Sequence, residues 1–72
     1  MINNKTQEAL IILQEECAEV IQAASKIYRF GIDNTHKSGK TQRENLEMEI
    51  GDMLALVDIL IEQNVINLYN VN

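Results

Sequence analysis

Apolar residues recur every three or four positions over two long stretches of the chain, which is the period of amphipathic helices. The first stretch covers residues 6–30 and the second covers residues 41–63. Between them, residues 31–40 collect Gly, Asp, Asn, Thr, Lys and Ser, which are typical of a loop. The pattern therefore predicts an all-α fold with two long helices.

Local signals place the ends of these helices. Thr6 is expected to cap the first helix at its start, and Gly31 is expected to stop it. Thr41 can cap the second helix, and Glu44 follows three residues later, which is the spacing of a capping box. The tail, residues 64–72, is expected either to dock as a short helical turn or to fray.

The first helix carries two neighbouring apolar stripes. One stripe consists of Ala9, Ile12, Leu13, Val20, Ala23 and Ile27. The other consists of Leu10, Cys17, Ile21, Ala24 and Tyr28. Together they are wider than one partner helix needs. We therefore expect residues 1–72 to form a single domain, an antiparallel helical hairpin that assembles into a four-helix bundle as a dimer or tetramer.

Composition narrows the class of protein. The net charge of −5 argues against binding to duplex nucleic acid, which requires a basic surface. Cys17 is the only cysteine, so a disulfide framework is excluded and a reducing compartment is favoured. Residues 1–7 are polar, unlike a signal peptide, and no apolar run is long enough to span a bilayer. We expect a cytoplasmic protein that does not bind membranes.

Four acids interrupt the apolar faces of the helices. At about 100° per residue, Glu16 points along the middle of the first stripe and Glu19 lies to one side of it. Glu49 and Asp52 repeat this arrangement on the second helix. Two unit charges about 4 Å apart repel by roughly 4 kcal/mol at an effective dielectric constant of 20. Four carboxylates that point inward therefore need cations or protons.

A hard divalent cation meets this need, because Mg²⁺ takes oxygen ligands and keeps waters that phosphates can replace. A single inward acid more often pairs with an Arg, but two matched pairs favour a metal. The predicted ligands are Glu16, Glu19, Glu49 and Asp52. Iron or zinc is disfavoured, because a di-iron bundle uses Glu-x-x-His motifs and the one histidine, His36, falls in the loop. Mn²⁺ is the expected substitute.

Two motifs resemble a known family. Residues 15–19 (EECAE) match the EExxE motif of the MazG-like all-α nucleotide pyrophosphohydrolases, and residues 49–52 (EIGD) match their ExxD motif. The resemblance covers residues 6–63 and is greatest to the short MazG-like proteins of many bacteriophages and some bacteria. If a phage encodes the chain, the expected compartment is the host cytoplasm.

The resemblance implies an activity. The family hydrolyses (deoxy)nucleoside triphosphates to the monophosphate and pyrophosphate, at sites formed between subunits of a dimer or tetramer. It implies that the four predicted ligands bind Mg²⁺, and that Glu15, with Glu16, is catalytic by holding a second ion or activating water. Lys26, Arg29 and Lys40 are the expected substrate-binding residues.

The sequence leaves alternatives for the roles of several other residues and for the function. Lys5 and Lys37 are expected to face solvent and Tyr28 to pack, whereas Phe30 either packs or stacks on a base. Residues 64–72 do not resemble the Lys-rich helix that follows in short family members. Either the first half of the chain supplies the cations for the phosphates, or activity is reduced. The alternatives are a nucleotide- or metal-binding module without turnover and a structural dimerisation hairpin.

Overall fold

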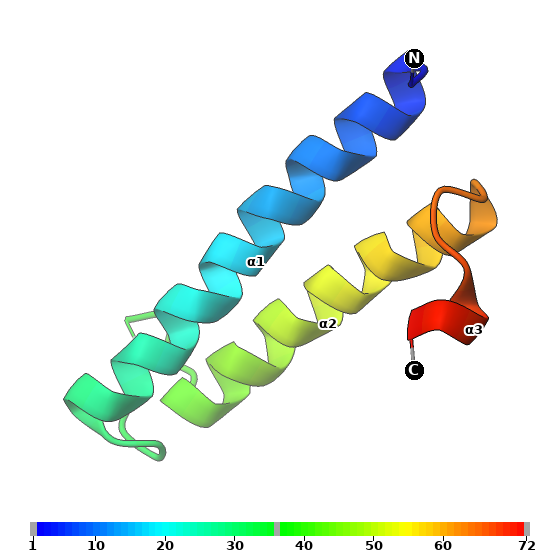
Figure 1. The fold of residues 1–72 in the computed structure, drawn as a ribbon. Helices are drawn as coiled ribbons and strands as arrows, with labels where there is room; N and C mark the ends of the chain where they lie inside the picture. The colour runs from blue at the N-terminus through cyan, green and yellow to red at the C-terminus, as the bar shows by residue number, and fades with distance from the viewer. Residues whose placement is uncertain (1, 36, 72) are drawn as a thin grey trace.

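Two long antiparallel helices make up most of the computed structural model, which describes residues 2–35 and 37–71. The helices are α1 (Asn4–Phe30), α2 (Gln42–Glu62) and the short α3 (Leu68–Val71). Figure 1 shows α1 and α2 joined by the loop at one end of the hairpin, with α3 folded back beside the far end of α2. The described residues contain no strand, only an isolated bridge between Thr35 and Thr41. The prediction of an all-α hairpin is confirmed. The prediction that His36 falls in the loop concerns a residue outside the described ones.

The first helix starts earlier than predicted. Asn3, not Thr6, is the N-cap, and its Oδ1 accepts a hydrogen bond from the N–H of Thr6 at 2.8 Å. Thr6 instead lies inside the first turn and is buried. The prediction of Thr6 as the cap was wrong because Asn3 offers an equally good capping oxygen three residues earlier. The prediction that Gly31 stops this helix is confirmed. Gly31 has a φ of +92° and donates its N–H to the Ile27 carbonyl at 2.9 Å.

The second helix starts as predicted, with a complete capping box. Thr41 Oγ1 accepts from the N–H of Glu44 at 3.1 Å, and Glu44 Oε1 accepts from the N–H of Thr41 at 3.0 Å. The loop satisfies a further amide of the first turn, because the N–H of Gln42 donates to the Asn34 carbonyl at 2.9 Å. The loop is therefore folded back onto the start of α2.

The buried apolar residues of α1 come from its first stripe. Ala9 and Ala23 from that stripe are buried, together with Leu60 of α2. The second stripe is covered only in part: Ile21 is 69% exposed and Tyr28 is 92% exposed, whereas its other members are half-buried. The expectation that Tyr28 packs is wrong within a single chain. One hairpin therefore leaves an apolar face of α1 without a partner.

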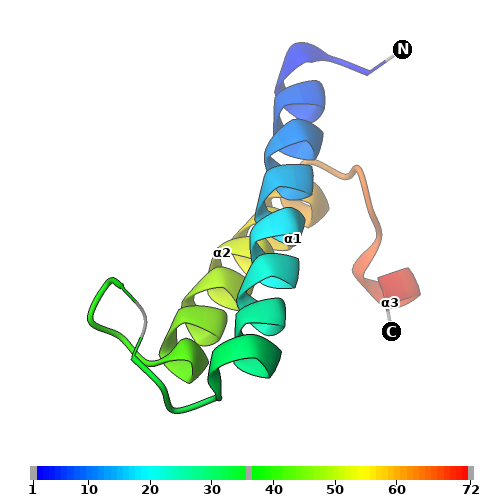
Figure 2. The same cartoon turned by 90° about the vertical axis from the view of Figure 1, so that its left-hand side faces the viewer.

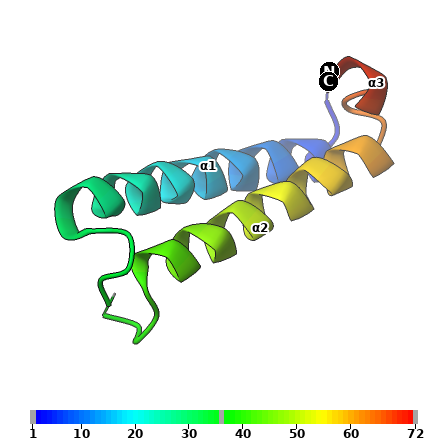
Figure 3. The same ribbon diagram turned by 90° about the horizontal axis from the view of Figure 1, so that it is seen from below.

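The molecule is elongated, as Figures 2 and 3 show from two further directions. Its extents are 44 × 25 × 17 Å and its radius of gyration is 14.6 Å. A globular domain of this length has a radius of gyration of about 11 Å. The accessible surface is 5495 Å², against roughly 4,500 Å² for a typical folded monomer of this mass. The chain thus exposes more surface than its mass requires. Among the described residues, no helix combines the length and apolarity needed to cross a membrane.

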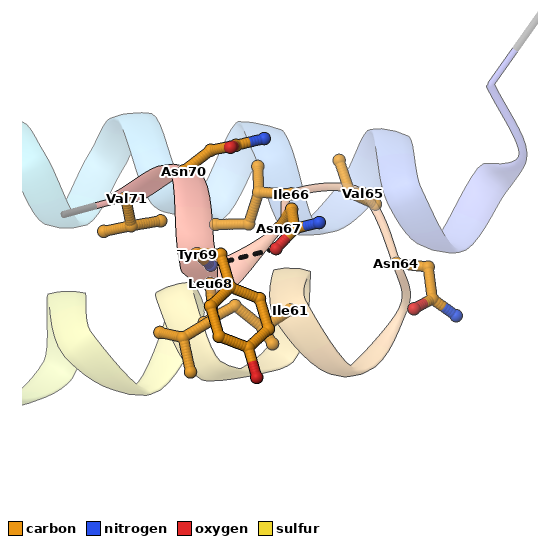
Figure 4. Close-up of a pocket in the computed structure, with 9 residues that line it drawn as sticks. All are labelled: Ile61, Asn64, Val65, Ile66, Asn67, Leu68, Tyr69, Asn70 and Val71. Carbon is orange, nitrogen blue, oxygen red and sulfur yellow. Dashed lines mark hydrogen bonds between the residues drawn. The ribbon is translucent and has the colours of Figure 1, made fainter.

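The tail turns away from α2 at Asn64, whose φ is +59°. The N–H of Val65 donates to the Leu60 carbonyl at 2.9 Å, and the N–H of Tyr69 donates to Asn67 Oδ1 at 2.9 Å. Figure 4 shows the tail curled beside the end of α2, where it lines an open depression of about 830 Å³. Of the two predicted outcomes for the tail, the described part adopts the short helical turn.

Candidate metal centre

Glu16, Glu19 and Glu49 converge between the two long helices. Each offers one carboxylate oxygen, and these oxygens all lie within 4.8 Å of one another. Glu16 and Glu19 stand one turn apart on α1, because a spacing of three residues returns side chains to the same side of a helix. Glu49 comes from α2. The antiparallel hairpin thus brings together acids that are thirty or more residues apart in the sequence.

One oxygen of Glu16 has no hydrogen-bond partner among residues 2–35 and 37–71. Its Oε2 is buried and makes no hydrogen bond. Burial, followed by the charges of Glu19, Asp52 and Glu15, raises the pKa of Glu16. Buried polar atoms in folded proteins nearly always find a partner, so an orphaned carboxylate oxygen calls for an explanation such as an ion.

The environment of Glu49 is similar. Burial raises the pKa of Glu49, and so do the contact with the Glu19 carboxyl and the charges of Glu19, Asp52 and Glu16. Desolvation and like charges both favour the neutral form of a carboxyl group. The cluster therefore attracts positive charge, and its donor set consists of carboxylate oxygens alone. Such a set fits a hard divalent cation such as Mg²⁺ or Mn²⁺.

Asp52 and Glu15 lie at the margin of this cluster. Asp52 is outside the group of oxygens within 4.8 Å, yet its charge contributes to the raised pKa of both Glu16 and Glu49. Glu15 is exposed, and its charge acts on Glu16. The structure therefore brings three of the four predicted ligands together and leaves Asp52 and Glu15 nearby.

The predicted substrate-binding residues lie at the loop end of the hairpin, away from the carboxylates. Arg29 stacks over the ring of Phe30, with its Cζ 5.0 Å from the ring centroid. Lys40 Nζ lies 3.4 Å from Met48 Sδ. Lys26 lines a pocket of about 220 Å³, which we call the loop-end pocket. The residues that line it are Lys26, Phe30, Asn34, Thr35, Lys37 and Gln42.

Four residues that line the loop-end pocket were not predicted to contribute to a site: Asn34, Thr35, Lys37 and Gln42. Lys37 was expected to face solvent, and it is exposed while also lining the pocket. Gln42 was not singled out at all, although it is only 4% exposed and its Oε1 makes no hydrogen bond within the part of the chain that the structure describes. Its spacing in the sequence could have indicated a place near the site, because Gln42 precedes Glu49 by seven residues and so shares its helix face.

Comparison with known proteins identifies a family. The MazG nucleotide pyrophosphohydrolase domain matches residues 4–71. The match includes α1, the loop, α2 and the described tail, and so extends beyond residues 6–63, on which the resemblance of the motifs rested. No curated protein and no solved structure matches the chain.

Proposed function

The chain belongs to the MazG nucleotide pyrophosphohydrolase domain family, and on this premise we propose that it hydrolyses (deoxy)nucleoside triphosphates to the monophosphate and pyrophosphate with Mg²⁺. The observation that carries the proposal is the convergence of Glu16, Glu19 and Glu49, one of which has a buried, unpartnered oxygen. A purely structural cluster of like charges would only destabilise the hairpin.

In this proposal Glu16, Glu19 and Glu49, joined by Asp52, hold Mg²⁺, and Mn²⁺ is an alternative. Asp52 needs only a side-chain adjustment, because it stands one helical turn from Glu49 on α2. When bound, the ion supplies positive charge that polarises the phosphate chain and offsets the charge of the leaving group.

Glu15 is the group that we propose for proton transfer. It is exposed beside the cluster, and so it is available to water. The oxygen of water forms a bond to the α-phosphorus while the bond from that phosphorus to the bridging oxygen of the β-phosphate breaks. The Glu15 carboxylate accepts the proton of the attacking water, and pyrophosphate leaves with the bonding electron pair.

A second copy of the chain is the partner that we propose for the exposed stripe of α1. Ile21 and Tyr28 form the most exposed part of that stripe. The surface in excess of a typical monomer is roughly 1,000 Å², which is close to the roughly 800 Å² that each partner buries in a standard interface. Two hairpins packed into a four-helix bundle, as a dimer or within a tetramer, would cover the stripe.

The charge of the chain and its single cysteine bear on nucleic-acid binding and on the compartment that we propose. The net charge of −5 makes duplex nucleic acid an unfavourable partner. The free thiol of Cys17 suits the reducing cytoplasm, where we place the reaction. Lys26, Arg29 and Lys40 at the loop end are the cations that we propose for contacts with the substrate.

A panel of nucleoside and deoxynucleoside triphosphates, incubated with the protein and Mg²⁺ and separated by chromatography, tests the activity. The expected products are the monophosphate and pyrophosphate, and both should disappear when a chelator is added. Release of the diphosphate and orthophosphate would assign a different reaction. If no product forms, titration with Mg²⁺ separates a binding module, which takes up the ion, from a structural hairpin, which does not.

A further inference from the structure

The loop-end pocket lies on the same face of the hairpin as the metal centre. Lys26 follows Glu19 by seven residues on α1, and Gln42 precedes Glu49 by seven residues on α2. Seven residues rotate a helix to within about 20° of the starting direction and advance it by roughly 10 Å. The pocket is therefore displaced from the carboxylates toward the loop by about two helical turns.

Gln42 is the residue of the pocket that most needs a ligand. Gln42 lines the pocket and is 4% exposed as a residue, and its buried Oε1 makes no hydrogen bond with the described residues. The backbone N–H of Gln42 is already bonded to the Asn34 carbonyl, which holds the loop against this side chain. A buried acceptor without a donor is costly, so the pocket suits a ligand group that carries an N–H or O–H.

This requirement distinguishes between the parts of a nucleotide. Ionised phosphate groups only accept hydrogen bonds, so they cannot satisfy Gln42 Oε1. The space of about 220 Å³ is also below the roughly 300–1,000 Å³ of pockets that enclose a whole small molecule. The pocket therefore fits one compact fragment that donates hydrogen bonds.

The other walls of the pocket favour a planar fragment. Phe30 is 48% exposed and lines the pocket, and the guanidinium of Arg29 covers its ring at 5.0 Å from the centroid. An aromatic side chain of this kind can stack on a base. Lys26 and Lys37 add donors for carbonyl or ring-nitrogen acceptors.

We propose that the loop-end pocket binds the nucleobase of the substrate, with Gln42 Oε1 accepting an N–H from the base edge and Phe30 stacking on its face. The inference rests on the proposed function, because it takes the phosphates of the same nucleotide to lie at the metal centre. A nucleobase combines a flat face, N–H donors and acceptors in one fragment, and the ribose and α-phosphate bridge the two helical turns to the carboxylates.

Binding of reaction products tests the proposal without turnover. The wild-type protein with Mg²⁺ is titrated with cytidine monophosphate, adenosine monophosphate, ribose 5-phosphate and pyrophosphate while NMR signals are recorded. The expected result is that the Gln42 side-chain amide and the Phe30 ring shift with the two monophosphates and not with the two probes that lack a base. Shifts of these signals with ribose 5-phosphate or pyrophosphate, or no shifts with any probe, would overturn it.

Base discrimination provides the second test. Gln42→Met keeps the length of the side chain and removes the amide, and Gln22→Met makes the same change at an exposed position of α1. We expect the largest ratio of kcat/KM among ATP, GTP, CTP and UTP to fall on the order of 10-fold in Gln42→Met. It should be unchanged in Gln22→Met.

The two tests separate this inference from the proposed function. If no triphosphate is hydrolysed, the proposed activity is wrong, and the NMR titration alone tests whether the pocket binds a nucleobase. If hydrolysis occurs but Gln42→Met keeps the wild-type ratios in a folded protein, the activity stands and the base pocket is wrong. Changed discrimination between ribose and deoxyribose, with unchanged discrimination between bases, would likewise overturn it.

Discussion

Glu19 of α1 and Glu49 of α2 face each other across the hairpin, each with a carboxylate oxygen within 4.8 Å of the other's. Hydrophobic side chains at these two positions would have joined the helices more firmly. The sequence instead places like charges there, and their repulsion opposes folding whenever both are ionised. Such a loss of stability is the expected relation between stability and function for the ion site that we propose.

Metal-free protein should therefore be more stable in mild acid than at neutral pH. Because the pKa values of Glu16 and Glu49 are raised above the ordinary value of 4.5, the folded state binds their protons more tightly than the unfolded chain does. Their stabilising contribution is fully present below about pH 4.5 and is lost as the pH rises through the raised values. Melting with a chelator present, across the mildly acidic to neutral range, measures this.

Two comparisons accompany that measurement. Glu44 acts in the opposite sense, because its hydrogen bonds with Thr41 lower its pKa, so its contribution is lost as the pH falls through the lowered value. Glu44→Gln should therefore lose stability at neutral pH and not in strong acid. Saturating Mg²⁺ should reverse the trend near neutrality, since the ion binds the ionised carboxylates. A melting temperature that climbs steadily from pH 5 to pH 7 without metal would refute the assignment to Glu16 and Glu49.

The capping box at the start of α2 gives a prediction about stability alone. Thr41→Ala removes the oxygen that accepts from the N–H of Glu44, and it should destabilise the protein by about 1 kcal/mol. For a domain of this size, that loss lowers the melting temperature by roughly 4–8 °C. Ser25→Ala, at an exposed position within α1, is the control and should change stability little. Equal effects of the two substitutions would show that the cap does not stabilise α2.

Local signals predicted the helix ends where the relevant residues are close in sequence. Thr41 and Glu44 form their capping box through contacts only three residues apart, and Gly31 stops α1 by its own backbone conformation. The start of α1 was mispredicted because Asn3 and Thr6 are both good capping residues, and local chemistry does not choose between them. In the structure Thr6 is buried, so tertiary packing uses it as part of the core.

The convergence of the carboxylates was predicted from the sequence to a similar extent. Helical periodicity alone placed Glu16, Glu19 and Glu49 on the sides of the helices that face each other, because the period of a helix is fixed by its backbone. The expectation that Glu19 points inward is only partly met, since this residue is exposed. The marginal place of Asp52 depends on how α1 and α2 cross and on side-chain rotamers, which the pattern does not encode. Gln42 was missed because its burial arises when the loop folds back onto α2, through hydrogen bonds between residues eight and eleven positions apart that the helical period does not encode.

Self-association should depend on the exposed stripe of α1. Ile21→Glu places a charge in the middle of that stripe, where a second copy would have to desolvate it. We expect wild-type melting to depend on protein concentration, and we expect Ile21→Glu to sediment as a monomer. Gln22→Glu, at the neighbouring exposed position, should leave the assembly intact. A wild-type protein that sediments as a stable monomer would end this idea.

Removal of either cation at the loop end of α1 should weaken substrate binding more than removal of Lys5. Lys26→Ala removes a cation that lines the loop-end pocket, and it should raise KM by about 5- to 10-fold if one charge-assisted hydrogen bond is lost. Arg29→Ala should have a smaller effect, because Arg29 acts through its stacking on Phe30. Lys5→Ala, near the opposite end of α1, is the matched control. Equal Michaelis constants for the three variants would contradict this placement.

Glu49→Gln should increase the stability of the metal-free protein while it removes activity. The substitution keeps the shape of the side chain but deletes a charge that repels Glu19, Asp52 and Glu16, so the metal-free melting temperature should rise. The rise in melting temperature on adding Mg²⁺ should become smaller, because that stabilisation depends on affinity for the folded cluster and one ligand is weakened.

Turnover and a matched control decide whether Glu49 holds the ion. Hydrolysis should fall by a large factor in Glu49→Gln, since the remaining carboxylates bind Mg²⁺ less tightly and position it less well. Glu47→Gln makes the same change on the exposed side of α2 and should alter neither melting nor turnover appreciably. The measurements are melting with and without Mg²⁺ and the rate of pyrophosphate release, for wild type and both variants. If Glu49→Gln releases pyrophosphate at the wild-type rate, or Mg²⁺ leaves the wild-type melting temperature unchanged, the carboxylate cluster is not the metal site, whatever activity the protein has.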